Sequence, residues 1–64
     1  MKFILKIDLD NGYFVDDAGE VDTCNLARII HKVSRQVRET IPTPSAFGSI
    51  RDGNGNTVGH WEIK

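Results

Sequence analysis

Six acidic residues fall within fifteen positions near the start of the chain, and they are its most conspicuous reactive groups. They are Asp8, Asp10, Asp16, Asp17, Glu20 and Asp22. So many carboxylates in a short stretch create a strong local negative potential. This favours a surface that binds a basic partner, including one built to hold nucleic acid. The alternative is a set of ordinary loop acids, of which Glu20 or Asp22 complements the positive end of a helix.

Metal binding is a second chemistry that such residues can support, because hard cations take several oxygen ligands. The six acidic residues lack the spacing of a helix–loop–helix calcium site. Residues 52–56 match the first, third and fifth ligand positions of that loop, but Thr57 replaces its glycine and Ile63 its bidentate glutamate. We therefore expect a plain hairpin turn at residues 52–56, and neither a metal nor another cofactor.

Cysteine and histidine are too sparse for nucleophilic catalysis. Cys24 and His31 are seven residues apart, which on a helix separates them by about 10 Å of axial rise. His60 lies beside Glu62 on one face of a strand, a position suited to an ion pair. A chain of this size also has little room to enclose a substrate pocket. We expect no enzymatic activity, and we expect Cys24 to be a small buried side chain.

Charge is unevenly distributed along the chain, although the net charge is only −1. Residues 1–22 carry −4, residues 23–41 carry +3, and the remainder is neutral. The positive segment holds Arg28, Lys32, Arg35 and Arg38. These cations could contact phosphates, so a nucleic-acid-binding face is the alternative to an acidic binding surface. Four cations are also typical of an ordinary solvated helix.

A helix must position these residues, and the spacing predicts one over residues 22–41. Apolar residues recur there at steps of three and four, which is the period of one helix stripe. They are Leu26, Ile29, Ile30, Val33, Val37 and Ile41. Asp22 or Thr23 can cap the first turn. The two prolines of the stiff linker 42–45 end the helix, because proline lacks an amide donor.

Three segments around the helix are predicted to be strands. Residues 3–9 alternate in polarity, which indicates one buried face. A second strand covers residues 47–52 and a third covers residues 57–64, joined by a turn of the residues that tight hairpins favour. Residues 13–15 are predicted to form a loop whose aromatic side chains tuck against the start of the helix, with a further short strand as the alternative.

The order strand, helix, strand, strand predicts an α+β fold, β-α-β-β, as a single small domain spanning residues 1–64. We expect a three-stranded mixed sheet with the helix packed on one face. A right-handed crossover sets the first strand parallel to the second, and we favour the third strand in the middle, antiparallel to both. The predicted core is Phe3, Leu5, Ile7, Leu9, Leu26, Ile29, Ile30, Val33, Val37, Ile50, Trp61 and Ile63. The uncovered face, either solvated or an interface, carries Ile4, Lys6, Asp8, Phe47, Ser49, Arg51, Val58, His60 and Glu62.

Length and composition limit the oligomeric states and the cellular compartments to be expected. A chain of 64 residues buries only about 60% of its unfolded surface, so a weak homodimer is the alternative to a monomer. A single cysteine excludes an internal disulfide and suits a reducing compartment. The first residues contain no apolar run long enough for a signal peptide or membrane helix. We expect a cytoplasmic protein without a membrane partner.

Two segments resemble small uncharacterised proteins of bacteriophages and prophages. The first is Lys6-Ile7-Asp8-Leu9-Asp10-Asn11, followed by Phe14 and Asp16-Asp17. The second runs from Arg51 to Glu62 as Arg-Asp-x-Asn-Gly-Asn-x-Val-Gly-x-Trp-Glu. The phage and prophage proteins that these segments resemble also have a single helix in the middle of the chain. The chain departs from them in a longer, proline-rich connection after that helix.

The resemblance implies no activity, and no catalytic residue follows from it. Small acidic phage proteins are often antagonists of host machinery, and anti-CRISPR proteins of similar size include mimics of DNA, a similarity of class and not of motif. We therefore expect a non-enzymatic phage-type protein-binding module in the host cell. It would inhibit a host defence complex through the acidic surface. The alternative is a small nucleic-acid-binding accessory protein that uses the cations of the helix.

Overall fold

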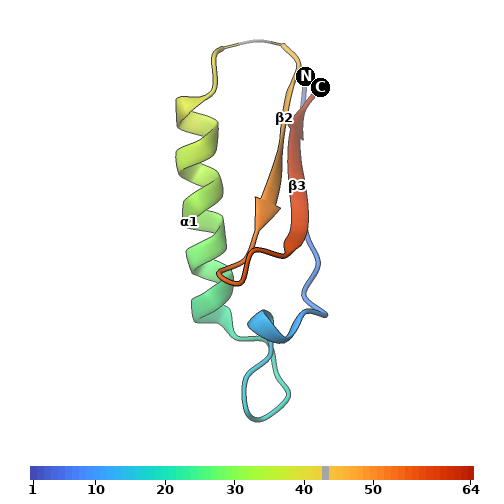
Figure 1. The fold of residues 1–64 in the computed structure, drawn as a ribbon. Helices are drawn as coiled ribbons and strands as arrows, with labels where there is room; N and C mark the ends of the chain where they lie inside the picture. Colours follow the sequence, from blue (N-terminus) through green and yellow to red (C-terminus); the bar gives the residue numbers. More distant parts are fainter. Residues whose placement is uncertain (43) are drawn as a thin grey trace.

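The computed structural model describes residues 1–42 and 44–64, in which one helix lies along a three-stranded sheet (Figure 1). In chain order the elements are β1 (Phe3–Ile7), the 3-10 helix η1 (Gly12–Phe14), α1 (Thr23–Glu39), β2 (Ala46–Arg51) and β3 (Thr57–Ile63). The molecule is elongated, with principal extents of 41 × 18 × 17 Å. The structure is therefore a small α+β fold, as predicted. Thr43, in the predicted stiff linker, lies outside the described residues.

The sheet is antiparallel throughout, so the prediction of a mixed sheet is wrong. The strand order is β1-β3-β2, which confirms the predicted central position of the third strand. Both outer strands pair with β3 in antiparallel register. The outer strands therefore run in the same direction, but the central strand separates them, and they form no parallel pair.

Local sequence explains where α1 begins and ends. The Asp22 carboxylate accepts the Asn25 amide at 3.0 Å and caps the first turn. At the other end Thr40 has left the helix, and its hydroxyl donates to the Gln36 carbonyl at 2.7 Å. The cap at Asp22 is as predicted. The helix stops short of Ile41, whose side chain is exposed and does not extend the buried stripe.

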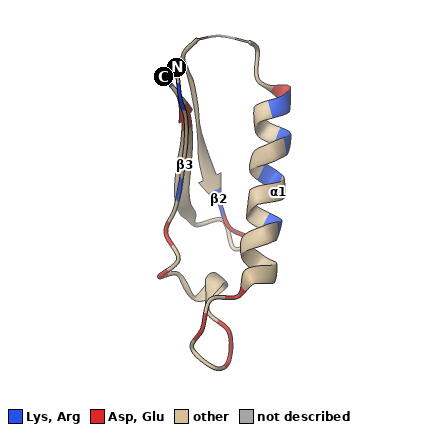
Figure 2. Ribbon diagram, turned by 180° about the vertical axis from the view of Figure 1, so that it is seen from behind, with Lys and Arg blue, Asp and Glu red and all other residues tan. Residues whose placement is uncertain are grey.

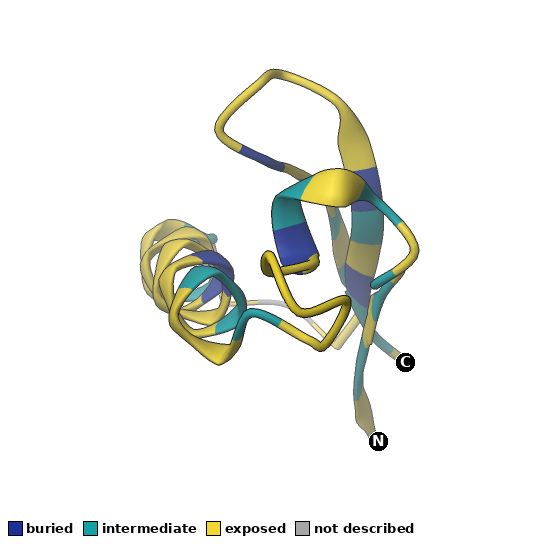
Figure 3. Cartoon of the chain, turned by 90° about the horizontal axis from the view of Figure 1, so that it is seen from below, coloured by how far each residue is buried: buried dark blue, intermediate teal, exposed yellow. Residues whose placement is uncertain are grey.

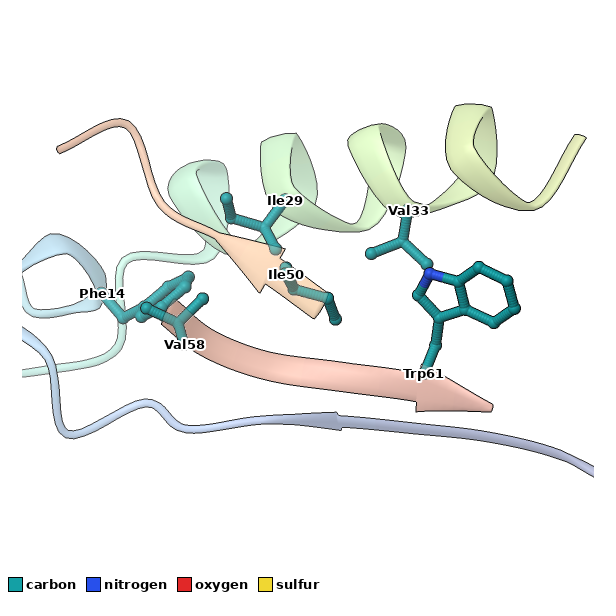
Figure 4. Packing of buried hydrophobic residues seen from close by; sticks show 6 residues of the cluster. All are labelled: Phe14, Ile29, Val33, Ile50, Val58 and Trp61. Carbon is teal, nitrogen blue, oxygen red and sulfur yellow. The ribbon is translucent and has the colours of Figure 1, made fainter. Parts of the chain in front are cut away.

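A small apolar core lies between α1 and the sheet (Figure 4). Its buried members are Phe14, Ile29, Val33, Ile50, Val58 and Trp61. Seen from the end of the molecule, buried residues face the space between the helix and the sheet, and the outer side of the helix is exposed (Figure 3). Much of the predicted core is confirmed, but Phe3 and Ile30 are 51% and 45% exposed. The cause is that α1 lies closest to β2 and leaves the β1 side uncovered.

Two buried apolar residues fall outside the predicted core, and each has a local cause. Phe14 is fully buried because residues 12–14 form η1, in place of the predicted loop or strand, and η1 packs against α1. Strict alternation places Val58 on the uncovered face of the sheet. In the pairing of β2 with β3, Ile50 lies opposite Gly59 and Arg51 lies opposite Thr57. Val58 is therefore an extra residue in β3 that no residue of β2 faces. This β-bulge turns Val58 into the core.

Candidate functional site

The six acidic residues near the start of the chain gather at one end of the molecule, which we call the acidic end. The acidic end comprises Asp8, Asp10, Asp16, Asp17, Glu20 and Asp22. It is formed by the segment that follows β1, the loop 15–21 and the start of α1 (Figure 2). Both termini lie at the opposite end. The fold therefore brings all six predicted binding residues to one end of the molecule.

Three of these carboxylates accept hydrogen bonds from the backbone of their own turns. Asp8 accepts the amide two residues further along at 2.9 Å. Asp16 accepts the amides of Ala18 and Glu20, each at 2.9 Å, and Asp22 caps α1. Side-chain bonds of this kind define the shape of a loop. These three carboxylates therefore have a structural role whatever the acidic end binds.

The other three carboxylates, those of Asp10, Asp17 and Glu20, are exposed and have no hydrogen bond or ion pair with any described residue. The ion pair formed in the described part of the chain joins Lys64 and Glu62 at 3.7 Å and lies near the termini. No cation among the described residues therefore forms an ion pair with the acidic end. Charge that is not compensated internally remains available to a partner of opposite sign.

The loop 15–21 gives the tip of the acidic end a defined conformation. An antiparallel bridge joins its first and last residues. Between them the Asp16 amide donates to the Glu20 carbonyl at 2.8 Å, and the Gly19 amide donates to the Asp16 carbonyl at 3.0 Å. Gly19 has a φ of 80°, a left-handed conformation that glycine adopts without steric cost. The loop is therefore a hydrogen-bonded hairpin.

The predicted helix cations are exposed, and their positions recur along the length of α1 (Figure 2). They are Arg28, Lys32, Arg35 and Arg38. Arg28 donates to the Asn25 side-chain oxygen at 3.0 Å, and the Lys32 ammonium donates to the Arg51 carbonyl at the end of β2 at 3.2 Å. A polar groove beside them is lined by Lys32, Arg35, Gln36 and Glu39. The arrangement places positive charge along the helix and at the β2 edge.

The reactive side chains are dispersed. Cys24 is exposed on the first turn of α1, so the prediction that it is buried is wrong; it lies off the stripe that carries Ile29 and Val33. His31 is exposed on the same helix, and His60 is exposed opposite Lys6 in the sheet. Within residues 1–42 and 44–64, no three His, Cys, Asp or Glu residues gather in a way that could hold a metal ion. No helix in the described chain is long and apolar enough to cross a membrane.

Asp52 is a buried carboxylate, 3% exposed, in the turn between β2 and β3. Its Oδ1 atom accepts the amides of Asn54 and Asn56 at 2.9 Å each. Burial by itself raises the pKa of this carboxyl, but the two amides, helped by the side chains of Asn56 and Asn11, outweigh burial and lower the pKa below its ordinary value. The segment is therefore a hairpin turn that Asp52 organises with its own side chain.

An apolar groove runs between β1 and α1, and no pattern in the sequence indicates it. Its lining is Phe3, Leu5, Ile30, Val33, Ser34 and Val37, around a volume of about 290 Å³. Apolar periodicity assigns Phe3 and Ile30 to the core, because it shows which face of the strand and which face of the helix are apolar. It does not show where the helix lies across the sheet. The position of α1 nearest β2 is what opens the groove.

Comparison of the chain with protein-family models, with curated proteins and with solved structures finds no match. Function is therefore inferred from the geometry and charge of this chain. Two surfaces are candidates for binding: the acidic end, with three free carboxylates, and the exposed cations of α1.

Proposed function

We propose that the protein is a non-enzymatic binding module whose acidic end docks on a basic surface of a partner protein. One observation carries the proposal. Six carboxylates gather at one end of an elongated molecule, and none of them forms an ion pair with the described residues. Surface charge of one sign attracts a surface of the opposite sign, speeds association and disfavours partners of like charge.

Asp10, Asp17 and Glu20 are the residues that we expect to contact the partner, because their carboxylates make no bond with the described residues. The hydrogen-bonded loop 15–21 presents two of them at its tip. Carboxylates held in this way can engage the Arg and Lys side chains that otherwise bind phosphate groups. The acidic end would then imitate nucleic acid. The three carboxylates that accept backbone amides would maintain its shape.

The resemblance to bacteriophage proteins supplies the setting for this proposal. It favours an anti-CRISPR-like inhibitor that acts in the host cell and occupies the nucleic-acid channel of a defence complex. The alternative, a nucleic-acid-binding accessory protein, would use the cations of α1. It is favoured by the exposed guanidinium groups of Arg35 and Arg38, which have no partner among the described residues.

The test measures how the protein competes with a labelled target duplex for a purified DNA-targeting CRISPR effector. We expect the wild-type protein to block duplex binding. The double variant D17N/E20Q removes two free charges without changing the Asp16 turn, and it should raise the inhibitory concentration about tenfold. The matched control E39Q/E62Q removes the same number of charges far from the acidic end, and should inhibit as the wild type does.

The outcomes separate the two candidate functions. Equal inhibition by both double variants, or no inhibition by the wild type, would contradict docking through the acidic end on such a complex. Urea unfolding would establish that both variants are as stable as the wild type. Retardation of the duplex by the protein alone, lost as salt is added, would favour the cations of α1 instead.

A further inference from the structure

The outer edge of β1 is a free row of backbone hydrogen-bonding groups. Lys2 and Lys64 exchange both of their backbone hydrogen bonds, at 2.6 and 3.0 Å, and the Asp8 amide donates to Val58 at 2.7 Å. The even-numbered residues of β1 therefore bond to β3. In an antiparallel ladder the intervening residues point their N–H and C=O groups the other way. Residues 3, 5 and 7 thus present unpaired backbone groups at the sheet edge.

The apolar groove lies directly beside this edge. Phe3 and Leu5 contribute their side chains to the groove from the strand, and Ile30 contributes from the helix. Phe3 and Ile30 are each about half exposed. An unpaired strand edge next to exposed apolar side chains is a ready template for another strand.

The β2 edge is protected in ways that the β1 edge is not. The Lys32 ammonium donates to the last carbonyl of β2, that of Arg51. The groove on this side is lined by charged and amide side chains of α1. Charged side chains at an edge discourage strand addition, because a new strand would have to bury them. The asymmetry selects β1 as the edge that accepts a partner.

We propose that the partner is a second copy of this chain, which pairs β1 with β1 in antiparallel orientation about a two-fold axis at Leu5. In this register Leu5 faces its own copy, Phe3 faces Ile7 of the second copy, and Ile4 faces Lys6 of the second copy. Lys2 faces Asp8 of the second copy. Both chains then use their outward-pointing backbone groups, and apolar residues face apolar residues on the groove side.

Charge complementarity fixes this register against its neighbours. Opposite charges across strands stabilise a pair, and like charges directly opposite destabilise it. The central register sets Lys2 against Asp8 twice, once at each end of the new ladder. A shift by two residues in one direction sets Lys2 against Lys6 of the second copy. A shift in the other direction sets Lys6 against its own copy, so of these three registers only the one centred on Leu5 avoids a Lys–Lys pair.

The resulting dimer would be a continuous six-stranded sheet. Its two-fold axis stands perpendicular to the sheet, so both helices lie on the same side and the two apolar grooves meet across the axis. The exposed parts of Phe3 and Ile30 would be covered there. Apart from Asp8, the acidic end is formed by residues 10–22, beyond the paired strands, and this part would remain accessible in each copy.

A charge-swap experiment tests the register. Sedimentation equilibrium of the full chain should show a monomer–dimer equilibrium, and K2E should raise its dissociation constant about tenfold, because Asp8 then faces a like charge at both ends. D8K should also weaken the dimer, through Lys2. The double variant K2E/D8K restores opposite charges and should recover most of the affinity, although D8K also removes the bond from Asp8 to the amide of residue 10.

Cross-linking supplies a readout independent of charge. Ile4 and Lys6 of the second copy form a pair without mutual hydrogen bonds, whose Cα atoms lie about 4.5 Å apart, within disulfide range. In a C24S background, which removes the exposed native thiol, a mixture of I4C and K6C chains should form a mixed disulfide under mild oxidation. The matched mixture of I4C and S49C, with the second thiol on the β2 edge, should not.

Each outcome decides the proposal. Swap rescue together with the I4C–K6C cross-link supports the β1 dimer. A strict monomer at millimolar concentration, a dimer indifferent to K2E, or cross-linking through S49C instead of K6C would overturn it. Because the variants leave Asp17 and Glu20 unchanged, failure of the dimer can be distinguished from failure of the acidic-end proposal.

Discussion

The two outer strands of the sheet are bordered very differently by the single helix. Beside β2 the helix lies close and supplies a charged and polar border that includes Lys32, Gln36 and Glu39. Beside β1 it stands away, and the border is an apolar groove. One helix is about 10 Å across with its side chains, whereas three strands spaced by about 4.8 Å occupy about 14 Å, so the helix cannot cover all three strands equally. The uncovered side is where the molecule has apolar surface to offer.

Trp61 explains why the helix favours β2. A side chain at Gly48 of β2 would lie 2.5 Å from the indole nitrogen, so glycine at this position makes room for the ring. The indole N–H donates to the Gln36 side-chain oxygen at 2.9 Å. On the β1 side Phe3 stacks on the same indole, with ring centroids 6.1 Å apart and an interplanar angle of 30°. The helix is thereby tied toward β2, and Phe3 remains at the rim.

The largest effects should come from the two glycines that let each outer strand approach β3. A Cβ atom at Gly59 would overlap the Lys6 carbonyl of β1, and one at Gly48 would press on Trp61. We expect G59A to lower the free energy of unfolding by about 3 kcal/mol and G48A by about 2 kcal/mol, since backbone yields less than a side chain. Urea unfolding would measure both losses.

The two glycine variants also distinguish the β1 edge of the sheet from the β2 edge. G59A disturbs β1 and should abolish self-association even at concentrations where the variant is folded, whereas G48A should retain it. A G59A variant within about 0.5 kcal/mol of the wild type would show that β1 does not pair as closely with β3 as described.

A smaller loss of stability should follow acidification, and it should arise at Asp52, in the turn that follows β2. The pKa of Asp52 is lowered in the folded protein below its ordinary value of 3.8. Its contribution to stability is therefore present above pH 3.8 and is lost as the pH falls through the folded pKa. We expect D52N to remove this part of the acid dependence in urea unfolding between pH 7 and pH 2. D17N, at an exposed carboxylate with no partner among the described residues, is the control and should retain this acid dependence.

The smallest effect on stability should come from Lys32, yet it bears directly on the β2 edge. K32L removes one exposed bond to the Arg51 carbonyl and should change the free energy of unfolding by no more than about 0.5 kcal/mol. It also removes charge from that edge, so sedimentation should reveal additional association that K2E does not suppress. R38L, which removes a cation with no partner among the described residues, is the matched control. Equal association by both variants would indicate that Lys32 does not protect β2.

Much of this fold could be predicted because its signals are local. The period of the apolar residues located α1, the Asp22 cap marked its start, and Gly and Asn marked the turn between β2 and β3. The burial of Val58 was not predicted, because a β-bulge breaks the alternation of buried and exposed residues along β3. The contact of the aromatic residues 13–15 with the start of α1 was predicted, but the 3-10 helix that buries Phe14 was not, because a turn of three residues has no periodicity to detect.

Only part of the candidate surfaces could be predicted from the sequence. The six acidic residues lie close enough in the sequence to be recognised as a cluster. Which of their carboxylates are free depends on hydrogen bonds within the loops, such as those of Asp16, and the spacing of the residues does not reveal these bonds. The apolar groove depends on the lateral position of the helix, which follows from the contact between Trp61 and Gly48. Long-range packing of this kind has no signature in a single sequence.

The mutual backbone bonds between Lys2 and Lys64 place the two ends of the described chain side by side, away from the acidic end (Figure 2). A short peptide could join them into a ring without disturbing the sheet. The same geometry lets the whole unit be inserted into a surface loop of another protein, since both ends leave from one place. The fold is therefore suited to being carried as a module, with its charged tip pointing away from whatever carries it.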